Sequence, residues 1–130
     1  MTRTAPLPTR SAGTIRAVQA SAVLSVVVLL VQFVTAGQML ADNGGARDGH
    51  AAGAIALHVV GLLLVVATAL HARAGGARWP VVVSAAVLVA GFVQAALGDA
   101  GNMGAHVPGA LVLTVGTVWV TAWAFTRHPA

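Results

Sequence analysis

The sequence predicts an all-α integral membrane four-helix bundle made of two parallel helical-hairpin repeats. Three observations support this fold. The chain of 130 residues is 58% hydrophobic and only 8% charged, whereas soluble domains carry about a quarter charged residues. Its apolar residues form four long runs, and a pattern that joins the first run to the second recurs where the third joins the fourth. We therefore expect a multi-pass protein of a lipid bilayer.

Each apolar run is close to the ~20 residues that a helix needs to cross ~30 Å of hydrocarbon. The runs are Ala17–Leu40, Ala51–Leu70, Val81–Leu97 and Val107–Phe125. The third is the shortest, but Trp79 and Pro80 precede it and suit a helix that starts at the membrane interface. The expected domains are a cytoplasmic tail at 1–16, a four-helix domain at 17–126 with hairpins 17–72 and 79–126, and a second tail at 127–130.

The distribution of charge predicts the orientation of these helices. Arginines flank the runs on one side of the membrane: Arg3, Arg10, Arg16, Arg73, Arg78 and Arg127. Only Arg47 lies on the other side, together with the acidic residues Asp42, Asp48 and Asp99. The positive-inside rule therefore places both termini in the cytoplasm, as in a bacterial plasma-membrane protein. Because the basic residues are divided among two tails and a short loop, they do not indicate nucleic-acid binding.

The composition excludes several kinds of active site. The chain has no cysteine, so thiolate metal sites, disulfides and cysteine nucleophiles are excluded. The sequence also lacks a P-loop, a dinucleotide fingerprint and a Ser-His-Asp pattern. Hydrolytic and nucleotide-driven chemistry are therefore not expected.

Segments 38–57 and 94–113 match without a gap at an offset of 56 residues. The segments "QMLADNGGARDGHAAGAIAL" and "QAALGDAGNMGAHVPGALVL" share the pattern Q-x11-H-x2-G-A-x2-L, which pairs Gln38 with Gln94 and His50 with His106. Two hairpins that enter from the same side are parallel repeats about an axis normal to the membrane. Both histidines should then point toward that axis at one depth. Coincidence in a chain of low complexity is the alternative.

Two imidazoles that face each other across a four-helix bundle are typical axial ligands of a haem iron. At 100° per residue, Ala54, Leu57 and Gly61 lie within ~40° of His50 on its helix. The corresponding positions on the helix of the other histidine are Ala110, Leu113 and Thr117. Such positions leave room for a flat macrocycle, although small residues also line ordinary close-packed helices in membranes. The sequence thus predicts one haem b with His50 and His106 as ligands.

At these positions the chain resembles one half of the haem A synthase family, the cytochrome oxidase assembly proteins. "VQAALG" at 93–98, followed by His106 and "GALVL", resembles the third and fourth helices of such a half. "VQFVTAGQML", followed by His50, resembles the first and second helices more loosely. The resemblance spans roughly residues 18–126. It implies a histidine near the outer end of the second and fourth helices that holds a b-type haem or attends a substrate haem.

The chain also departs from that family. The resemblance implies a glutamate shortly before the first histidine and, in many bacterial members, a cysteine pair nearby. This chain has neither, and offers only Asp48 before His50. Haem-methyl oxidation is therefore in doubt, no catalytic residue is predicted, and haem binding is the property that the resemblance supports. Single-half members pair as oligomers, so the resemblance implies a homo-oligomer as partner.

Other polar residues near the predicted haem have two interpretations each. Gln38 and Gln94, near the outer ends of their helices, suit interhelical hydrogen bonds or contact with the haem. Arg47 suits either a haem propionate or a solvated loop paired with Asp42 or Asp48.

The remaining histidines have no partner in the repeat pattern. His58 corresponds to Thr114, and we expect it to bond a backbone carbonyl or a neighbouring threonine, or to act beside the cofactor. His71 and His128 are expected at the membrane interface or in the tail.

Three function classes follow. The first is a haem-b membrane protein that acts in electron transfer or in haem and oxidase assembly, with a respiratory-chain partner. The second is a copper site on the outer face, built from Met39, Met103, His50 and His106. The third is a cofactor-free accessory subunit or small transporter. The repeat favours haem, because it pairs two histidines but supplies no third strong ligand.

Overall fold

The computed structural model describes residues 9–42 and 44–126. Within these ranges the chain forms four helices and no strand. They are α1 (Thr9–Leu40), α2 (Ala46–Arg73), α3 (Trp79–Asp99) and α4 (Met103–Thr126). All four are long and apolar enough to cross a membrane. The predicted all-α bundle of four membrane-spanning helices is confirmed at this level.

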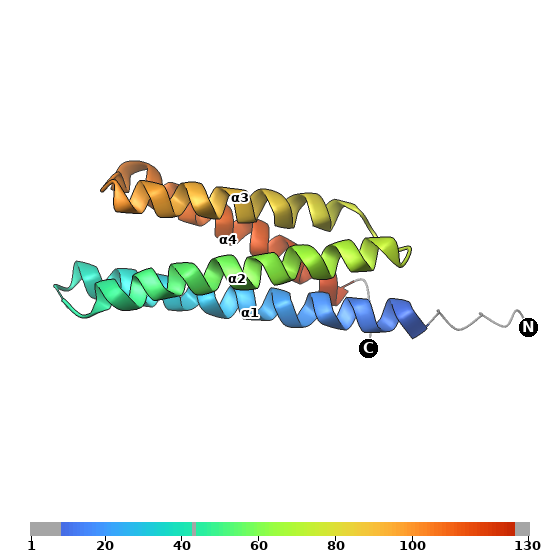
Figure 1. Cartoon of the computed structure of the whole chain (residues 1–130). Helices are drawn as coiled ribbons and strands as arrows, with labels where there is room; N and C mark the ends of the chain where they lie inside the picture. Colours follow the sequence, from blue (N-terminus) through green and yellow to red (C-terminus); the bar gives the residue numbers. More distant parts are fainter. Residues whose placement is uncertain (1–8, 43, 127–130) are drawn as a thin grey trace, which may run out of the picture.

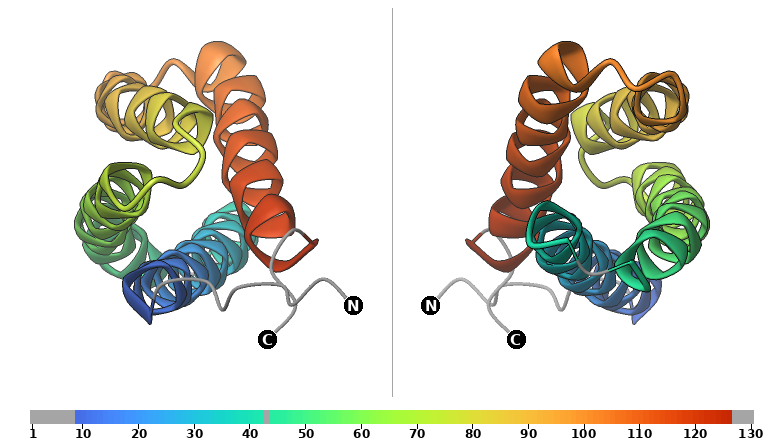
Figure 2. Two further views of the ribbon diagram at one scale, coloured as in Figure 1. Left: turned by 90° about the vertical axis from the view of Figure 1, so that its right-hand side faces the viewer. Right: turned by 90° about the vertical axis from the view of Figure 1, so that its left-hand side faces the viewer.

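The helices form a ring in which each one packs against the next in sequence and α4 returns to α1 (Figures 1 and 2). Consecutive helices run in opposite directions. Because each helix contacts only its two neighbours in the ring, α2 and α4 lie diagonally opposite each other. Figure 2 shows α4 strongly inclined to the direction of view. We call the end with loops 41–45 and 100–102 the histidine end. The opposite end, where α1 begins and α4 ends, carries loop 74–78 and is called the arginine end.

The helices extend beyond the apolar runs that predicted them. Helix α1 begins at Thr9, within the stretch expected to be a tail, and α2 begins at Ala46. Helix α4 begins at Met103, so His50 and His106 both lie on helices, near their first turns. Hydropathy marks only the part of a helix that meets lipid, whereas the helix itself continues through polar residues in water. Residues 1–8 and 127–130 of the predicted tails lie outside the described residues.

The ends of the helices follow from local sequence. Pro80 lies in the first turn of α3, where its missing N–H has no helical partner to lose. Asn102 caps α4, because its Oδ1 accepts a hydrogen bond from the Ala105 N–H at 3.3 Å. Helix α2 ends at Arg73, and two residues later Gly75 adopts a left-handed φ of 92°. The Gly76 N–H then bonds the His71 carbonyl and closes the turn. These local contacts allow short connections between consecutive helices.

The apolar core occupies the half of the bundle near the arginine end. It is made of Ile15, Val18, Ala22, Leu64, Ala67, Val120 and Ala124, with Trp79, Val83 and Trp123 packed against it. Toward the histidine end the interior is instead polar. It contains Gln32, His50, Gln94 and His106, none of which is exposed. The two halves of one bundle thus have different kinds of interior.

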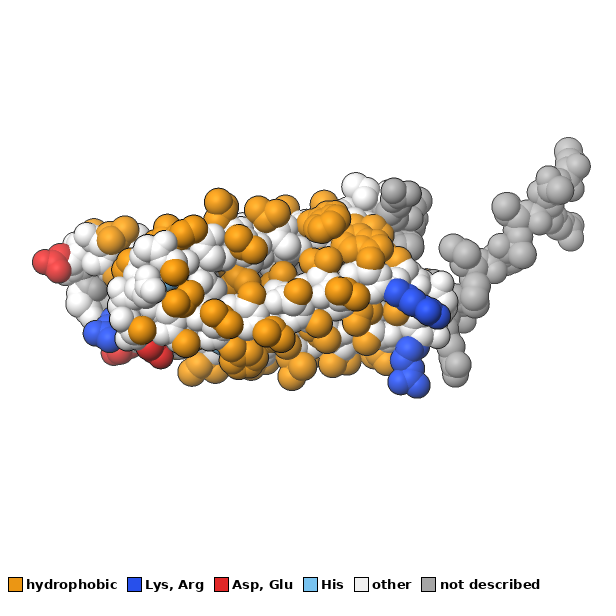
Figure 3. Space-filling model, turned by 90° about the horizontal axis from the view of Figure 1, so that it is seen from above, with side chains coloured by type: hydrophobic (Ala, Val, Ile, Leu, Met, Phe, Trp, Pro, Cys, Tyr) orange, Lys and Arg blue, Asp and Glu red, His pale blue; other side chains and the backbone are white. Residues whose placement is uncertain are grey.

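The surface between the two ends is apolar. Large side chains such as Leu30, Val82 and Val112 are more than half exposed, and in Figure 3 such side chains cover the length of the bundle. Blue basic side chains lie at both ends of that view, whereas the red acidic side chains lie only at the histidine end. A surface of this kind suits lipid contact along the helices and water at both ends.

Candidate functional site

The two histidines that the repeat pattern pairs lie together at the histidine end. His50 comes from α2 and His106 from α4, across the diagonal of the bundle. Their ring centres are 6.3 Å apart, with an angle of 65° between the ring planes. Both side chains are half-buried. The fold therefore brings residues 56 positions apart in sequence to one place.

The hydrogen bonds at Nδ1 favour the Nδ1–H tautomer in both rings. His106 Nδ1 lies 2.8 Å from the Gln94 carbonyl, which can only accept, so Nδ1 carries the proton. His50 Nδ1 lies 3.0 Å from the Thr35 Oγ1. The Val31 and Gln32 carbonyls both lie 3.0 Å from that hydroxyl. When its single hydrogen is donated to either of them, the oxygen accepts from the His50 Nδ1–H. Each neutral ring then has an Nε2 lone pair available for a ligand.

A glutamine from the preceding helix holds the backbone beside each histidine. Gln32 Nε2 on α1 donates to the His50 carbonyl at 3.0 Å, and Gln94 Nε2 on α3 donates to the His106 carbonyl at 2.6 Å. Neither amide leaves room for a side chain on the facing helix. A Cβ at position 53 would overlap the Gln32 amide, and one at position 109 would overlap the Gln94 amide. The glycine three residues after each histidine is therefore required by this contact.

The glutamine that serves His50 is Gln32, whereas the gap-free alignment had selected Gln38. The Gln38 side chain is exposed. The difference arises because α1 continues beyond the level of His50 before the chain turns. The glutamine and the histidine are therefore 18 residues apart in the first hairpin and 12 in the second. The sequence marked Gln32 as suited to an interhelical hydrogen bond but did not place it beside His50. It missed Thr35, and it missed Gly98, which lies against the His106 ring. Gln32 and Thr35 share one face of α1, and this polar pair in an apolar run was the available signal.

The residues predicted to lie below the histidines divide into two groups. Leu57, Gly61, Leu113 and Thr117 line an internal cavity of about 20 Å³ deeper in the bundle. Ala54 and Ala110 are half-buried between the histidines and that cavity. The helical-wheel argument thus placed the inward face of α2 and α4 correctly. Arg47 is exposed in the first turn of α2, at the same end as the histidines.

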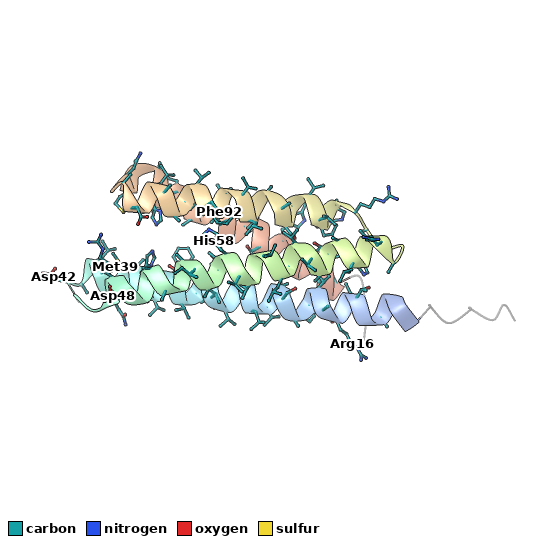
Figure 4. All side chains as sticks on the ribbon, in the orientation of Figure 1. Arg16, Met39, Asp42, Asp48, His58 and Phe92 are labelled. Atoms are coloured by element: carbon teal, nitrogen blue, oxygen red, sulfur yellow. The ribbon has the colours of Figure 1, made fainter. Side chains whose placement is uncertain are left out.

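His58 also lines the cavity. Its Nδ1 donates to the Ala54 carbonyl one turn earlier at 2.7 Å, as a carbonyl partner was expected. Its ring packs on Phe92 of α3 with a centre-to-centre distance of 4.1 Å (Figure 4). Its Nε2 is buried and has no hydrogen-bond partner among the described residues. His58 therefore does not join His50 and His106 as part of one cluster.

The other histidine of the described helices, His71, is buried, although the sequence suggested an interfacial side chain. It is 1% exposed. The cause is α1, which begins early enough to place Thr14 beside it, with Oγ1 3.2 Å from His71 Nδ1. Its ring also meets Trp123 edge-on. His128 lies outside the described residues.

The methionines required for copper are turned outward to a large extent. Met39 is 41% and Met103 is 49% exposed. Among residues 9–42 and 44–126, no three side chains of the His, Cys, Asp and Glu types come together as a metal site. A metal held at the histidine pair would need ligands from another source.

Comparisons of the whole chain with protein families, with curated proteins and with solved structures found no match.

Proposed function

We propose that this chain binds one b-type haem between α2 and α4, with His50 and His106 as its axial ligands. The observation that carries the proposal is the spacing of the two rings. Imidazole nitrogens at about 2 Å on both sides of one metal ion place the ring centres about 6.5 Å apart. The ring centres of His50 and His106 lie 6.3 Å apart.

The hydrogen bonds of the two rings also suit metal ligation. A ligating histidine usually donates its other N–H to a carbonyl or a similar acceptor, which fixes the ring and increases its basicity. His106 does so to the Gln94 carbonyl, and His50 to the Thr35 hydroxyl. Two protein ligands are sufficient here, because a porphyrin itself supplies four nitrogens. The lack of a third nearby ligand is thus compatible with haem and unfavourable to a bare metal ion.

The spacing of the two rings already suits one iron, but the porphyrin around it would need the neighbouring side chains to move aside. The separate cavity deeper in the bundle, at about 20 Å³, does not supply this room, because sites for ligands of this class need roughly 300 Å³ or more. Ala54 and Ala110, one turn after the histidines on α2 and α4, are the small side chains that would meet the macrocycle.

The proposed role is electron transfer or haem and oxidase assembly at a bacterial plasma membrane. With imidazoles on both faces the bound iron would have no open position, which suits electron transfer rather than oxygen chemistry. We infer that the two hairpins are parallel repeats, that the termini are cytoplasmic and that the histidine end faces outward. Exposed Arg47 would then pair with the propionates. The resemblance to a haem A synthase half supports the same assignment, without its catalytic glutamate.

An absorption spectrum of the protein purified with haem supplied tests the proposal. The wild type should show the spectrum of a six-coordinate, low-spin haem b. Replacing His50→Ala or His106→Ala removes one ligand, so each variant should lose that spectrum or convert it to high spin, and the two should behave alike. His58→Ala is the matched control, because this third intramembrane histidine lies outside the pair, and it should retain the haem.

Two results would contradict the proposal. One is a wild-type protein that remains colourless with haem present, which would favour a cofactor-free accessory subunit. The other is a His106→Ala variant that retains low-spin haem while His58→Ala loses it. In that case the two axial ligands would have to be reassigned, with His58 of α2 as one of them.

A further inference from the structure

The cavity in the middle of the bundle has two buried polar atoms with no protein partner. His58 Nε2 and Ser84 Oγ are both inaccessible to solvent and make no hydrogen bond with any described residue. Ser84 as a whole is 3% exposed. Both residues line the same cavity, His58 from α2 and Ser84 from α3. Two orphaned polar groups that share one space indicate a ligand that bonds both.

The tautomer of the neutral His58 ring defines which hydrogen bonds such a ligand must make. Its Nδ1 donates to the Ala54 carbonyl at 2.7 Å, so in the neutral ring Nε2 is a bare acceptor. The Ser84 hydroxyl can both donate and accept. A ligand that fits must therefore donate a hydrogen bond to His58 and exchange one with Ser84.

Two more hydroxyls on the cavity wall can only accept from this ligand. Ser25 Oγ donates to the Ser21 carbonyl, and Thr117 Oγ1 donates to the Leu113 carbonyl. Both donors are thus engaged, while the oxygen lone pairs remain. The wall as a whole offers up to four polar partners and is rich in acceptors.

We propose that this cavity is a hydration site in the membrane-spanning part of the bundle, in which water donates to His58 Nε2 and bonds Ser84 Oγ. Its volume of about 20 Å³ accommodates about one or two water molecules, and a buried water needs two to four polar partners. The site is separate from the histidine pair and does not depend on haem binding. It also makes His58 a histidine that meets water inside the bilayer.

Solid-state NMR of the ¹⁵N-histidine-labelled protein in lipid bilayers tests the proposal. Polarisation transferred from water protons should reach His58 Nε2, whose resonance is identified by its loss in His58→Gln. Gly91→Ala is the decisive variant, because a methyl group there would lie 3.6 Å from His58 Nε2 without overlapping it. The methyl would take the space of the water, so transfer to Nε2 should fall several-fold. Ser84→Ala, which removes one partner of the water, should reduce it partially.

Two controls keep the result interpretable. Gly37→Ala adds a methyl group on α1 in open space, and transfer to His58 should then equal that of the wild type. The exposed Asn102 side-chain amide, labelled with ¹⁵N, should receive water polarisation in every variant. Absence of transfer to wild-type His58 while Asn102 receives it would overturn the hydration site. Transfer that remains unchanged in both Gly91→Ala and Ser84→Ala would overturn it as well, because the water would then come from elsewhere.

Discussion

At the scale of single residues, the glutamine amides are the contacts that hold the histidine end together. Gly109→Ala should destabilise the protein by about 1–3 kcal/mol, because the added methyl group displaces the buried Gln94 amide from the His106 carbonyl. Gly53→Ala should act in the same way through Gln32 on the other side of the bundle. The midpoint of unfolding in detergent micelles measures both effects.

The matched control lies on the same helix. Gly104→Ala also adds a methyl group on α4, but the nearest atom is 3.9 Å away, at the exposed Asn102 side chain. Because alanine also favours the helical backbone over glycine, this variant should be as stable as the wild type or more stable. Equal destabilisation by Gly109→Ala and Gly104→Ala would show that the glutamine contact contributes little.

The histidine pair could be predicted from the sequence, whereas its supporting residues could not. His50 and His106 lie on equivalent turns of two helices that run in the same direction, so a fixed sequence offset describes them well. Gln32 lies on α1 on the other side of a loop, and the length of that loop breaks the offset. An ungapped alignment therefore selected Gln38, which is exposed. To predict which residues meet across a turn, one must know how many residues the turn contains, and the sequence pattern did not give that number.

At the scale of the helix, the two helices that carry His50 and His106 begin differently. Helix α4 has a side-chain cap, since Asn102 Oδ1 accepts from the Ala105 N–H and the Asn102 carbonyl accepts from the His106 N–H at 2.9 Å. In α2 the residue before the first turn is Gly45, and it provides no side-chain cap. The first turn of α4, which carries His106, therefore depends on a single asparagine.

Asn102→Ala tests that dependence. Loss of the cap should cost about 0.5–2 kcal/mol of helix stability, and it should act first on the turn that holds His106. Hydrogen exchange at the amide of His106 should become faster, while exchange near His50 should not change. Asn102→Ser retains a capping oxygen and is the conservative control, with exchange close to that of the wild type. Faster exchange at both histidines would argue for a general loosening of the end.

At the scale of the whole molecule, the number of helices and their approximate positions could be predicted from hydropathy. A chain in lipid must satisfy its backbone within each helix, so a long apolar run leaves few alternatives. The division of the interior into an apolar and a polar half could not be predicted in this way. The apolar core near the arginine end and the polar interior near the histidine end depend on which faces meet across four helices. His71 illustrates this, because its burial follows from the early start of α1.

The orientation of the bundle is the last prediction. Because the chain has no cysteine, single replacements place one thiol at each end. Gly44→Cys and Asn102→Cys mark the histidine end, where the acidic residues lie, and Ala77→Cys marks the arginine end, beside Arg73 and Arg78. An impermeant thiol reagent added to intact cells should label the first two variants. It should label Ala77→Cys only after the membrane is permeabilised, since arginine-rich loops stay in the cytoplasm.

This orientation determines where a haem held by His50 and His106 would exchange electrons. If the histidine end faces outward, its redox partner must act at the outer face of the membrane, and the short loops beside Arg47 would form the contact surface. Among the described residues, Arg16, Arg73 and Arg78 carry the charge that favours this arrangement. If Ala77→Cys were labelled in intact cells while Gly44→Cys and Asn102→Cys were protected, the bundle would have the opposite orientation in the membrane. The histidine pair would then serve a partner at the cytoplasmic face.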